Sequence, residues 1–164
     1  NWTITRFAKA NALARANGQS AFSILNNNLS LAVMERPVWP GCLTANTPQT
    51  LDYLRETGTA HLSWSSQARG FFVDPAQRTR LPTDTAPDTC YASAANDERR
   101  RRASELAAEK GVAPHHIAAA WVLAQSFPSF ALIGPRTPGE IATTLPALDI
   151  SLSDDQTAWL NLES

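Results

Sequence analysis

Short apolar runs alternate along this chain with stretches in which apolar residues recur at helical spacing. Residues 5–16 carry apolar side chains on one helical face, and Asn17-Gly18 supplies a left-handed stop. The apolar run 21–25 has the length and composition of a buried strand. Thr47-Pro48 gives an N-cap with proline at the first helical position, so we expect a helix that ends at Gly58. The first part of the chain is therefore predicted as helix, strand, helix.

The same alternation continues toward the C-terminus. Strands are expected at residues 60–65 and 130–133. Helices are expected at residues 96–110 and 115–126, and two more begin at Thr137-Pro138 and Ser153. Between Gly70 and Thr89 three prolines interrupt an irregular stretch. Connections of this length are commonly lids or binding loops.

Strands that alternate with helices predict an α/β fold with a parallel sheet. The order of elements does not separate an open sheet from a barrel, but the length bears on it. A complete (β/α)8 barrel needs about 200 residues or more, whereas this chain has 164. Only three full strands can be recognised, with the end of a fourth at Asn1-Trp2. We therefore expect one domain over residues 1–164, built as half a barrel or as a small open sheet.

Composition and charge exclude several classes of protein. Hydrophobic residues make up 43% of the chain and charged residues 18%, which is typical of a globular protein rather than a disordered one. A net charge of -1 argues against a nucleic-acid partner. Cys42 and Cys90 form neither a disulfide framework nor a metal-ligand pattern. No apolar run approaches the roughly 20 residues of a membrane span, and no secretion leader is visible. We expect a cytoplasmic protein without a metal site.

A run of arginines and a pair of histidines each have a structural explanation that requires no ligand. Residues 99–102 are four arginines after Glu98, but on a helix they spread around the circumference and pair with acids at i,i+4. We interpret them as a solvated helix face. His115-His116 are adjacent at a helix start and point about 100° apart, so the two rings cannot bind one metal ion together.

Two stretches have the residue types of a nucleotide site. From Ala131 to Glu140 a strand ends and a capped helix begins, and Arg136 offers a planar fork of donors that matches a phosphate. An ordinary strand-to-helix turn is the alternative. In residues 61–70, Trp64 precedes hydroxyl and amide side chains and an arginine, which suits a planar cofactor with phosphates. A core tryptophan is the alternative there.

Together with other segments, these stretches resemble the C-terminal half of the aldo-keto reductase family, in the family's order and spacing. The resemblance implies part of a (β/α)8 barrel, about four strand–helix units, and a parent enzyme that passes hydride from NADPH to an aldehyde or ketone. The segments that carry it are Asn1-Trp2, NNNLSLAVMERPVWPGC (26–42), SWSSQARGFF (63–72), IAAAWVLAQ (117–125), ALIGPRTPGEI (131–141) and LDISLSDDQTAWL (148–160).

The resemblance assigns roles at the nicotinamide end of NADP(H). Asn1 matches the asparagine that holds the nicotinamide carboxamide. Asn26 falls near the family's glutamine that shares this task, and it is Asn rather than Gln. Trp64 matches the aromatic residue that stacks on the nicotinamide ring. Ser65 and Gln67 match the loop along the pyrophosphate, although Gln67 stands where the family usually has leucine.

The resemblance also assigns the phosphate and adenine end. Arg69 belongs to the pyrophosphate loop, and Arg136 matches the position that meets the adenosine 2′-phosphate, which would favour NADP(H) over NAD(H). Glu140 and Thr144 match adenine-side positions that are more often Gln and Asn in the family.

The family's catalytic Asp, Tyr, Lys and His lie in its N-terminal half, so the resemblance assigns no catalytic residue to this chain. We expect NADP(H) binding without reduction of a carbonyl substrate. A non-catalytic NADP(H)-binding sensor or interaction protein is the alternative. Half a barrel leaves strand edges unpaired, so self-association, a need for the other half or low stability is expected.

Overall fold

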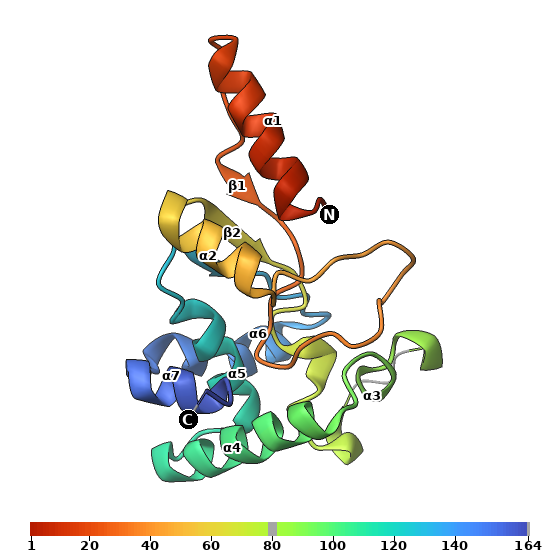
Figure 1. The fold of residues 1–164 in the computed structure, drawn as a ribbon. Helices are drawn as coiled ribbons and strands as arrows, with labels where there is room; N and C mark the ends of the chain where they lie inside the picture. The colour runs from red at the N-terminus through yellow and green to blue at the C-terminus, as the bar shows by residue number, and fades with distance from the viewer. Residues whose placement is uncertain (79–81, 164) are drawn as a thin grey trace.

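Three parallel strands form the centre of the fold in a computed structural model that describes residues 1–78 and 82–163 (Figure 1). The strands are β1 (Ile24–Leu25), β2 (Ala60–Ser63) and β3 (Ser129–Ala131), in the order β1-β2-β3. The parallel α/β prediction is confirmed. Each strand is shorter than the range of residues predicted for it from the sequence. Asn1-Trp2, predicted as the end of a fourth strand, lies outside any strand.

Helices follow the strands as the capping signals predict. Thr47 accepts a hydrogen bond from Thr50 N and opens α2, and Gly58 closes that helix at φ 63°. The fourth helix begins two residues before the expected start, because Ser93 rather than a later residue caps it. The helices are α1 (Ile4–Ala16), α2 (Pro48–Thr57), α3 (Pro87–Cys90), α4 (Ala94–Lys110), α5 (Pro114–Leu123), α6 (Pro138–Thr144) and α7 (Asp154–Leu160).

The predicted irregular stretch between Gly70 and Thr89 consists of short turns where it is described. It contains the 3₁₀ turns η2 (Pro75–Gln77) and η3 (Thr83–Thr85) and the start of α3. Residues 79–81 of this stretch lie outside the described residues. In the rest of the chain, η1 (Ala68–Gly70) follows β2 and η4 (Leu145–Asp149) follows α6.

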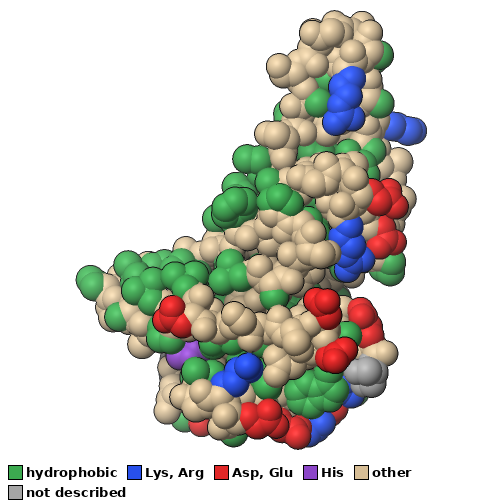
Figure 2. Space-filling view, turned by 90° about the vertical axis from the view of Figure 1, so that its left-hand side faces the viewer, with side chains coloured by type: hydrophobic (Ala, Val, Ile, Leu, Met, Phe, Trp, Pro, Cys, Tyr) green, Lys and Arg blue, Asp and Glu red, His purple; other side chains and the backbone are tan. Residues whose placement is uncertain are grey.

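The two faces of the sheet have different surroundings. Leu25, His61 and Ser63 share one face and are buried. Helix α5 packs against β3 and against α4 behind this face. On the opposite face, Ile24 and Phe130 are 48% and 53% exposed. In the space-filling view, hydrophobic side chains gather along the left-hand side of the molecule (Figure 2). One apolar face of the sheet is therefore left uncovered.

Helix α1 projects from the rest of the molecule (Figure 1). It packs against α2 through buried Ile4 and Phe7. The buried Asn11 side chain bonds both backbone groups of Phe22: Nδ2 donates to the carbonyl at 3.0 Å, and Oδ1 accepts from N–H at 2.9 Å. The segment before β1 is thereby fixed along the helix.

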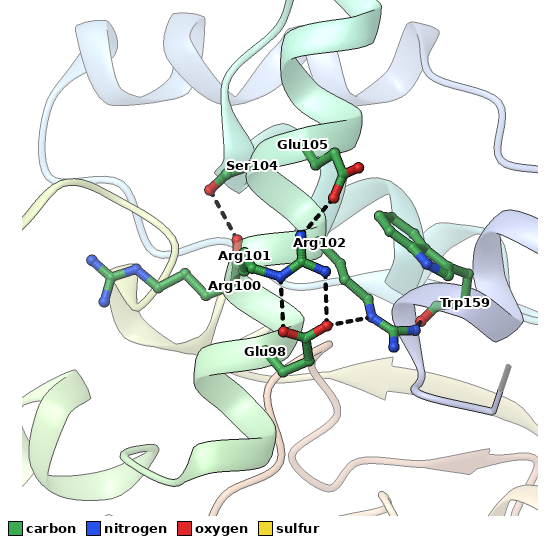
Figure 3. Close-up of polar contacts among 7 residues, drawn as sticks. All are labelled: Glu98, Arg100, Arg101, Arg102, Ser104, Glu105 and Trp159. Carbon is green, nitrogen blue, oxygen red and sulfur yellow. Dashed lines mark hydrogen bonds and ion pairs between the residues drawn. The ribbon is translucent and has the colours of Figure 1, made fainter.

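The arginine cluster of α4 joins this helix to α7 (Figure 3). Glu98 accepts hydrogen bonds from both Arg101 and Arg102, and Arg101 also bonds Glu105. Arg102 donates to the carbonyl of Trp159 in α7, and its guanidinium lies 5.2 Å from that ring. Only part of the cluster is therefore the solvated face that we predicted, because Arg102 is largely covered. No helix in the described parts of the chain is both long and apolar enough to span a membrane.

Candidate cofactor-binding site

A cleft of about 700 Å³ opens beyond the carboxyl ends of β2 and β3. Its walls are the segment that follows β2, the segment 132–136 and one side of α6. Parallel sheets bind ligands at this end, because the loops that leave the strands meet there. Most residues predicted for the cofactor line the cleft: Trp64, Ser65, Gln67, Arg69, Arg136, Glu140 and Thr144.

The segment after β2 has an unusual backbone. Ser65, Ala68 and Arg69 have positive φ angles of 50°, 49° and 57°. This conformation costs a non-glycine residue about 1–2 kcal/mol, and it is frequent at binding sites. The Ser66 hydroxyl donates to the Leu132 carbonyl at 2.8 Å and ties this segment to the end of β3. The two walls of the cleft are therefore fixed relative to each other.

Gln67 and Arg69, two polar residues of this segment, differ in their hydrogen bonds to the rest of the protein. Nε2 of Gln67 is buried and makes no hydrogen bond within the described part of the chain. An unpaired buried donor is costly, so a ligand acceptor in the cleft would relieve it. Arg69 donates from Nε to the Thr85 carbonyl at 2.8 Å. Arg69 therefore holds the connection after β2 as well as lining the cleft.

At the opposite wall, Glu140 acts on the backbone of Arg136. The Arg136 N–H donates to Glu140 Oε2 at 2.6 Å, and Thr137 caps α6 by accepting from the Glu140 N–H at 3.2 Å. In the described residues, the Arg136 guanidinium makes neither a hydrogen bond nor an ion pair. Glu140 thus leaves the cationic fork of Arg136 available to a ligand.

The cleft also includes residues that sequence reasoning missed. His115, at the start of α5, lines it beside Thr143. The His115 Nε2 lies 3.3 Å from the Thr143 carbonyl. Burial is the main cause that lowers the pKa of His115, with His116 adding to it and the bond to Thr143 opposing it. No local signal marks this residue, because it reaches the cleft through the packing of α5. The irregular stretch after Gly70, whose length is typical of a lid or binding loop, also lines the cleft with Val73, Gln77 and Arg78.

The two asparagines predicted for the nicotinamide do not line the cleft. The main-chain nitrogen of Asn1 lies 3.4 Å from the carbonyl oxygen of Asn26. The Asn1 side-chain oxygen accepts from Leu43 N–H at 3.1 Å. These residues lie together beside the end of β1, and the structure does not bring them to the seven predicted residues that line the cleft.

Trp64 connects these two regions. Its carbonyl accepts from Asn28 Nδ2 at 3.0 Å, and its ring stacks on Trp39 at a centroid distance of 4.7 Å and an angle of 29°. Asn28 also donates to the hydroxyl of Tyr91 at 3.4 Å. Burial raises the pKa of that Tyr91 hydroxyl to about 12, so it stays protonated. The position of Trp64 is thus fixed from the interior of the protein.

Comparisons with known proteins identify relatives. The sequence matches the model of the Aldo/keto reductase family over residues 1–161. It is 30% identical over 115 residues to the uncharacterized oxidoreductase YrpG of Bacillus subtilis, covering 69% of this chain and 34% of that protein. Norsolorinic acid reductase A of Aspergillus parasiticus is 27% identical over 154 residues, covering 90% of this chain and 34% of that protein. The norsolorinic acid reductase of Aspergillus flavus gives the same identity and coverage. The chain therefore spans about a third of the length of these curated relatives.

Proposed function

Because the chain belongs to the aldo/keto reductase family, we propose that it is the C-terminal, cofactor-binding portion of an NADP(H)-dependent reductase with a partial barrel. The complete form reduces aldehydes or ketones to alcohols in this proposal. One observation carries it: seven of the residues predicted for the cofactor line a single cleft at the carboxyl ends of the strands. The family's fold, a (β/α)8 barrel, uses this end of the strands for its ligands.

The side chains of the cleft suit a nucleotide that bears a 2′-phosphate. Arg136 would bind this phosphate, because its unengaged guanidinium can make two charge-assisted hydrogen bonds. The segment 65–69 would lie along the pyrophosphate. There, Gln67 offers the buried donor that is otherwise unpaired. The residues present therefore fit NADP(H), with the adenosine end at α6 and the nicotinamide end near Trp64.

Bound NADPH supplies the hydride for reduction of a carbonyl carbon, while the carbonyl oxygen takes a proton from an acid. The resemblance places that acid outside the residues of this chain. We propose that the chain binds the cofactor and does not reduce a carbonyl substrate on its own. For the complete protein, the proposed partner is a small carbonyl compound in the cytoplasm. Two cysteines, too few for a disulfide framework, are compatible with a reducing compartment.

The uncovered face of the sheet supports a proposal about assembly. In a closed barrel, side chains on this face would lie inside, but Ile24 and Phe130 are exposed here. We propose that the 164-residue chain associates through its open strand edges, either with a second copy or with further barrel strands. Light scattering after size exclusion tests the first alternative, because a monodisperse monomer across a wide concentration range would contradict association with a second copy.

Calorimetric titration with NADPH tests the cofactor proposal. We expect saturable binding to the 164-residue chain and weaker binding to Arg136→Ala. Loss of charge-assisted bonds corresponds to an affinity about tenfold to a hundredfold lower. NADH affinity should change little in this variant, because NADH has no 2′-phosphate. Arg55→Ala is the matched control, since Arg55 is an exposed arginine on α2 that pairs with Asp52.

Two results would contradict the proposal. If the folded chain binds no NADPH, the cleft is not a cofactor site in this chain. If NADPH is consumed when an aldehyde is added, a catalytic acid is present among the residues of this chain. In both measurements, a circular dichroism spectrum confirms that each variant is folded.

A further inference from the structure

One face of the Trp64 ring is already occupied by another side chain. Its ring is only partly buried and packs against the hydrophobic core. Trp64 also lines the cleft, so this residue lies between the core and the cleft. Trp39 stacks on its ring, with its centroid 4.7 Å away and its plane tilted by 29°. Trp39 itself is 45% exposed, so the stacked pair is open to solvent on the Trp39 side.

The turn that carries Trp39 contacts one of the two asparagines. Trp39 does not line the cleft. It lies in a turn in which Cys42 N–H donates to the Trp39 carbonyl at 3.1 Å. The next residue, Leu43, donates to the side chain of Asn1 at 3.1 Å. The stacked pair therefore joins Trp64, at the wall of the cleft, to the turn that contacts Asn1.

We propose that Trp39 occupies the stacking position of the nicotinamide ring, so that this ring displaces Trp39 when the cofactor binds. The inference rests on the proposed function and adds a residue that controls access to one end of the site. Under this arrangement, the adenosine end binds to Arg136 and the 65–69 segment without any change at Trp39. The nicotinamide end reaches Trp64 and the asparagines only after the Trp39 side chain has rotated away.

Trp39 is suited to move without unfolding its surroundings. The turn that carries it is held by backbone groups, namely the Trp39 carbonyl and the Leu43 N–H. Rotation of the indole leaves these bonds in place. Aromatic pairs have a modest energy, so competition by Trp39 should weaken nicotinamide binding by about twofold to tenfold. This penalty is small enough for the cofactor to overcome and large enough to measure.

Two ligands and two variants test the proposal by calorimetry. The ligands are NADPH and adenosine 2′,5′-bisphosphate, which has the adenosine phosphates but no nicotinamide. Trp39→Leu should bind NADPH about twofold to tenfold more tightly than the unmodified chain. Its affinity for adenosine 2′,5′-bisphosphate should be unchanged. Trp159→Leu is the matched control, because Trp159 lies on α7 and contacts Arg102 rather than the site.

A spectroscopic measurement on the unmodified chain does not depend on any variant. Two stacked indoles give an exciton signal in the far-ultraviolet circular dichroism spectrum. NADPH should abolish the signal of the Trp39–Trp64 pair, whereas adenosine 2′,5′-bisphosphate should leave it intact. Trp39→Leu should lack this signal with or without ligand.

The outcomes separate this inference from the proposed function. If neither ligand binds to the unmodified chain, the cofactor proposal fails, and the inference that rests on it fails too. If both ligands bind but Trp39→Leu binds NADPH equally or more weakly, only the inference is overturned. It is also overturned if the exciton signal persists with saturating NADPH, or if both ligands gain affinity equally in Trp39→Leu.

Discussion

The Arg78 side chain joins distant parts of the connection that follows β2, and its removal should be strongly destabilising. It is only 9% exposed, and Nη1 lies 2.8 Å from both carboxylate oxygens of Asp88. Nε donates to the Val73 carbonyl at 2.8 Å, and Nη2 donates to the Phe71 carbonyl at 2.9 Å. One guanidinium therefore holds residues 71–73 and residue 88 together beside the cleft.

The loss in the free energy of unfolding can be worked out from the bonds that Arg78 makes. Arg78→Met keeps much of the side-chain volume and removes every donor. Each carbonyl loses a bond to a charged donor, which is worth about 1.5 kcal/mol at the lower end of the usual range. Asp88 is 64% exposed, so water can solvate its carboxylate, and its ion pair adds about 0–1 kcal/mol. The free energy of unfolding should therefore fall by about 3–4 kcal/mol.

Urea unfolding followed by tryptophan fluorescence measures this change. Arg55→Met is the matched control, because Arg55 and its partner Asp52 are both well exposed. Its effect should stay below about 0.5 kcal/mol. Asp88→Asn should cost less than about 1 kcal/mol, since it leaves both carbonyl bonds of Arg78 intact. A loss below about 1 kcal/mol in Arg78→Met would refute the assignment of stability to the carbonyl bonds.

Three further predictions concern groups outside the cleft. Hydrogen bonds from Arg101, then Arg102, lower the pKa of Glu98 from 4.5 to about 2, so its stabilising contribution is present above pH 4.5 and is lost as the pH falls toward 2. The difference in melting temperature between the unmodified chain and Glu98→Gln should narrow over that interval. Burial lowers the pKa of His61 from 6.5 to about 4, so the unfolded chain takes up a proton first and stability falls as the pH drops from 6.5 to 4. Urea midpoints should show this slope, and His61→Gln should flatten it. Tyr91→Phe removes the hydroxyl that accepts a hydrogen bond from Asn28. In urea unfolding, the free energy of unfolding should fall by about 0.5–1.5 kcal/mol, and no change would contradict a stabilising role for that bond.

Helices could be predicted well from the sequence because their ends depend on local chemistry. Thr47-Pro48 and Gly58 mark α2 with residues whose caps form within one turn. Strand lengths could not be predicted, because a strand ends where its neighbour stops pairing. The apolar run 21–25 contributes only Ile24–Leu25 to the sheet, and β2 pairs with both neighbours over only a few residues. The hydrophobicity of a segment does not show where its pairing with a neighbouring strand ends.

The candidate site was predictable where it follows directly from a strand end. Trp64 and Arg136 come after β2 and β3, and parallel strands bring such positions to one end of the sheet. His115 and Arg78 reach the cleft from a helix start and a long connection, whose approach depends on tertiary packing. The stack of Trp39 on Trp64 was missed for the same reason, since no spacing rule relates residues 39 and 64.

The attachment of α1 has a consequence for how the molecule opens. This helix projects from the sheet and is held by Ile4 and Phe7 and by the two hydrogen bonds of Asn11. A unit with so few attachments can detach while β2, β3 and the cleft remain folded. The amide protons of α1 should then exchange with solvent through this partial opening. Their exchange should be faster than the free energy of global unfolding would allow. We therefore expect the N-terminal helix to open as a cooperative unit of its own, while the cleft retains its shape.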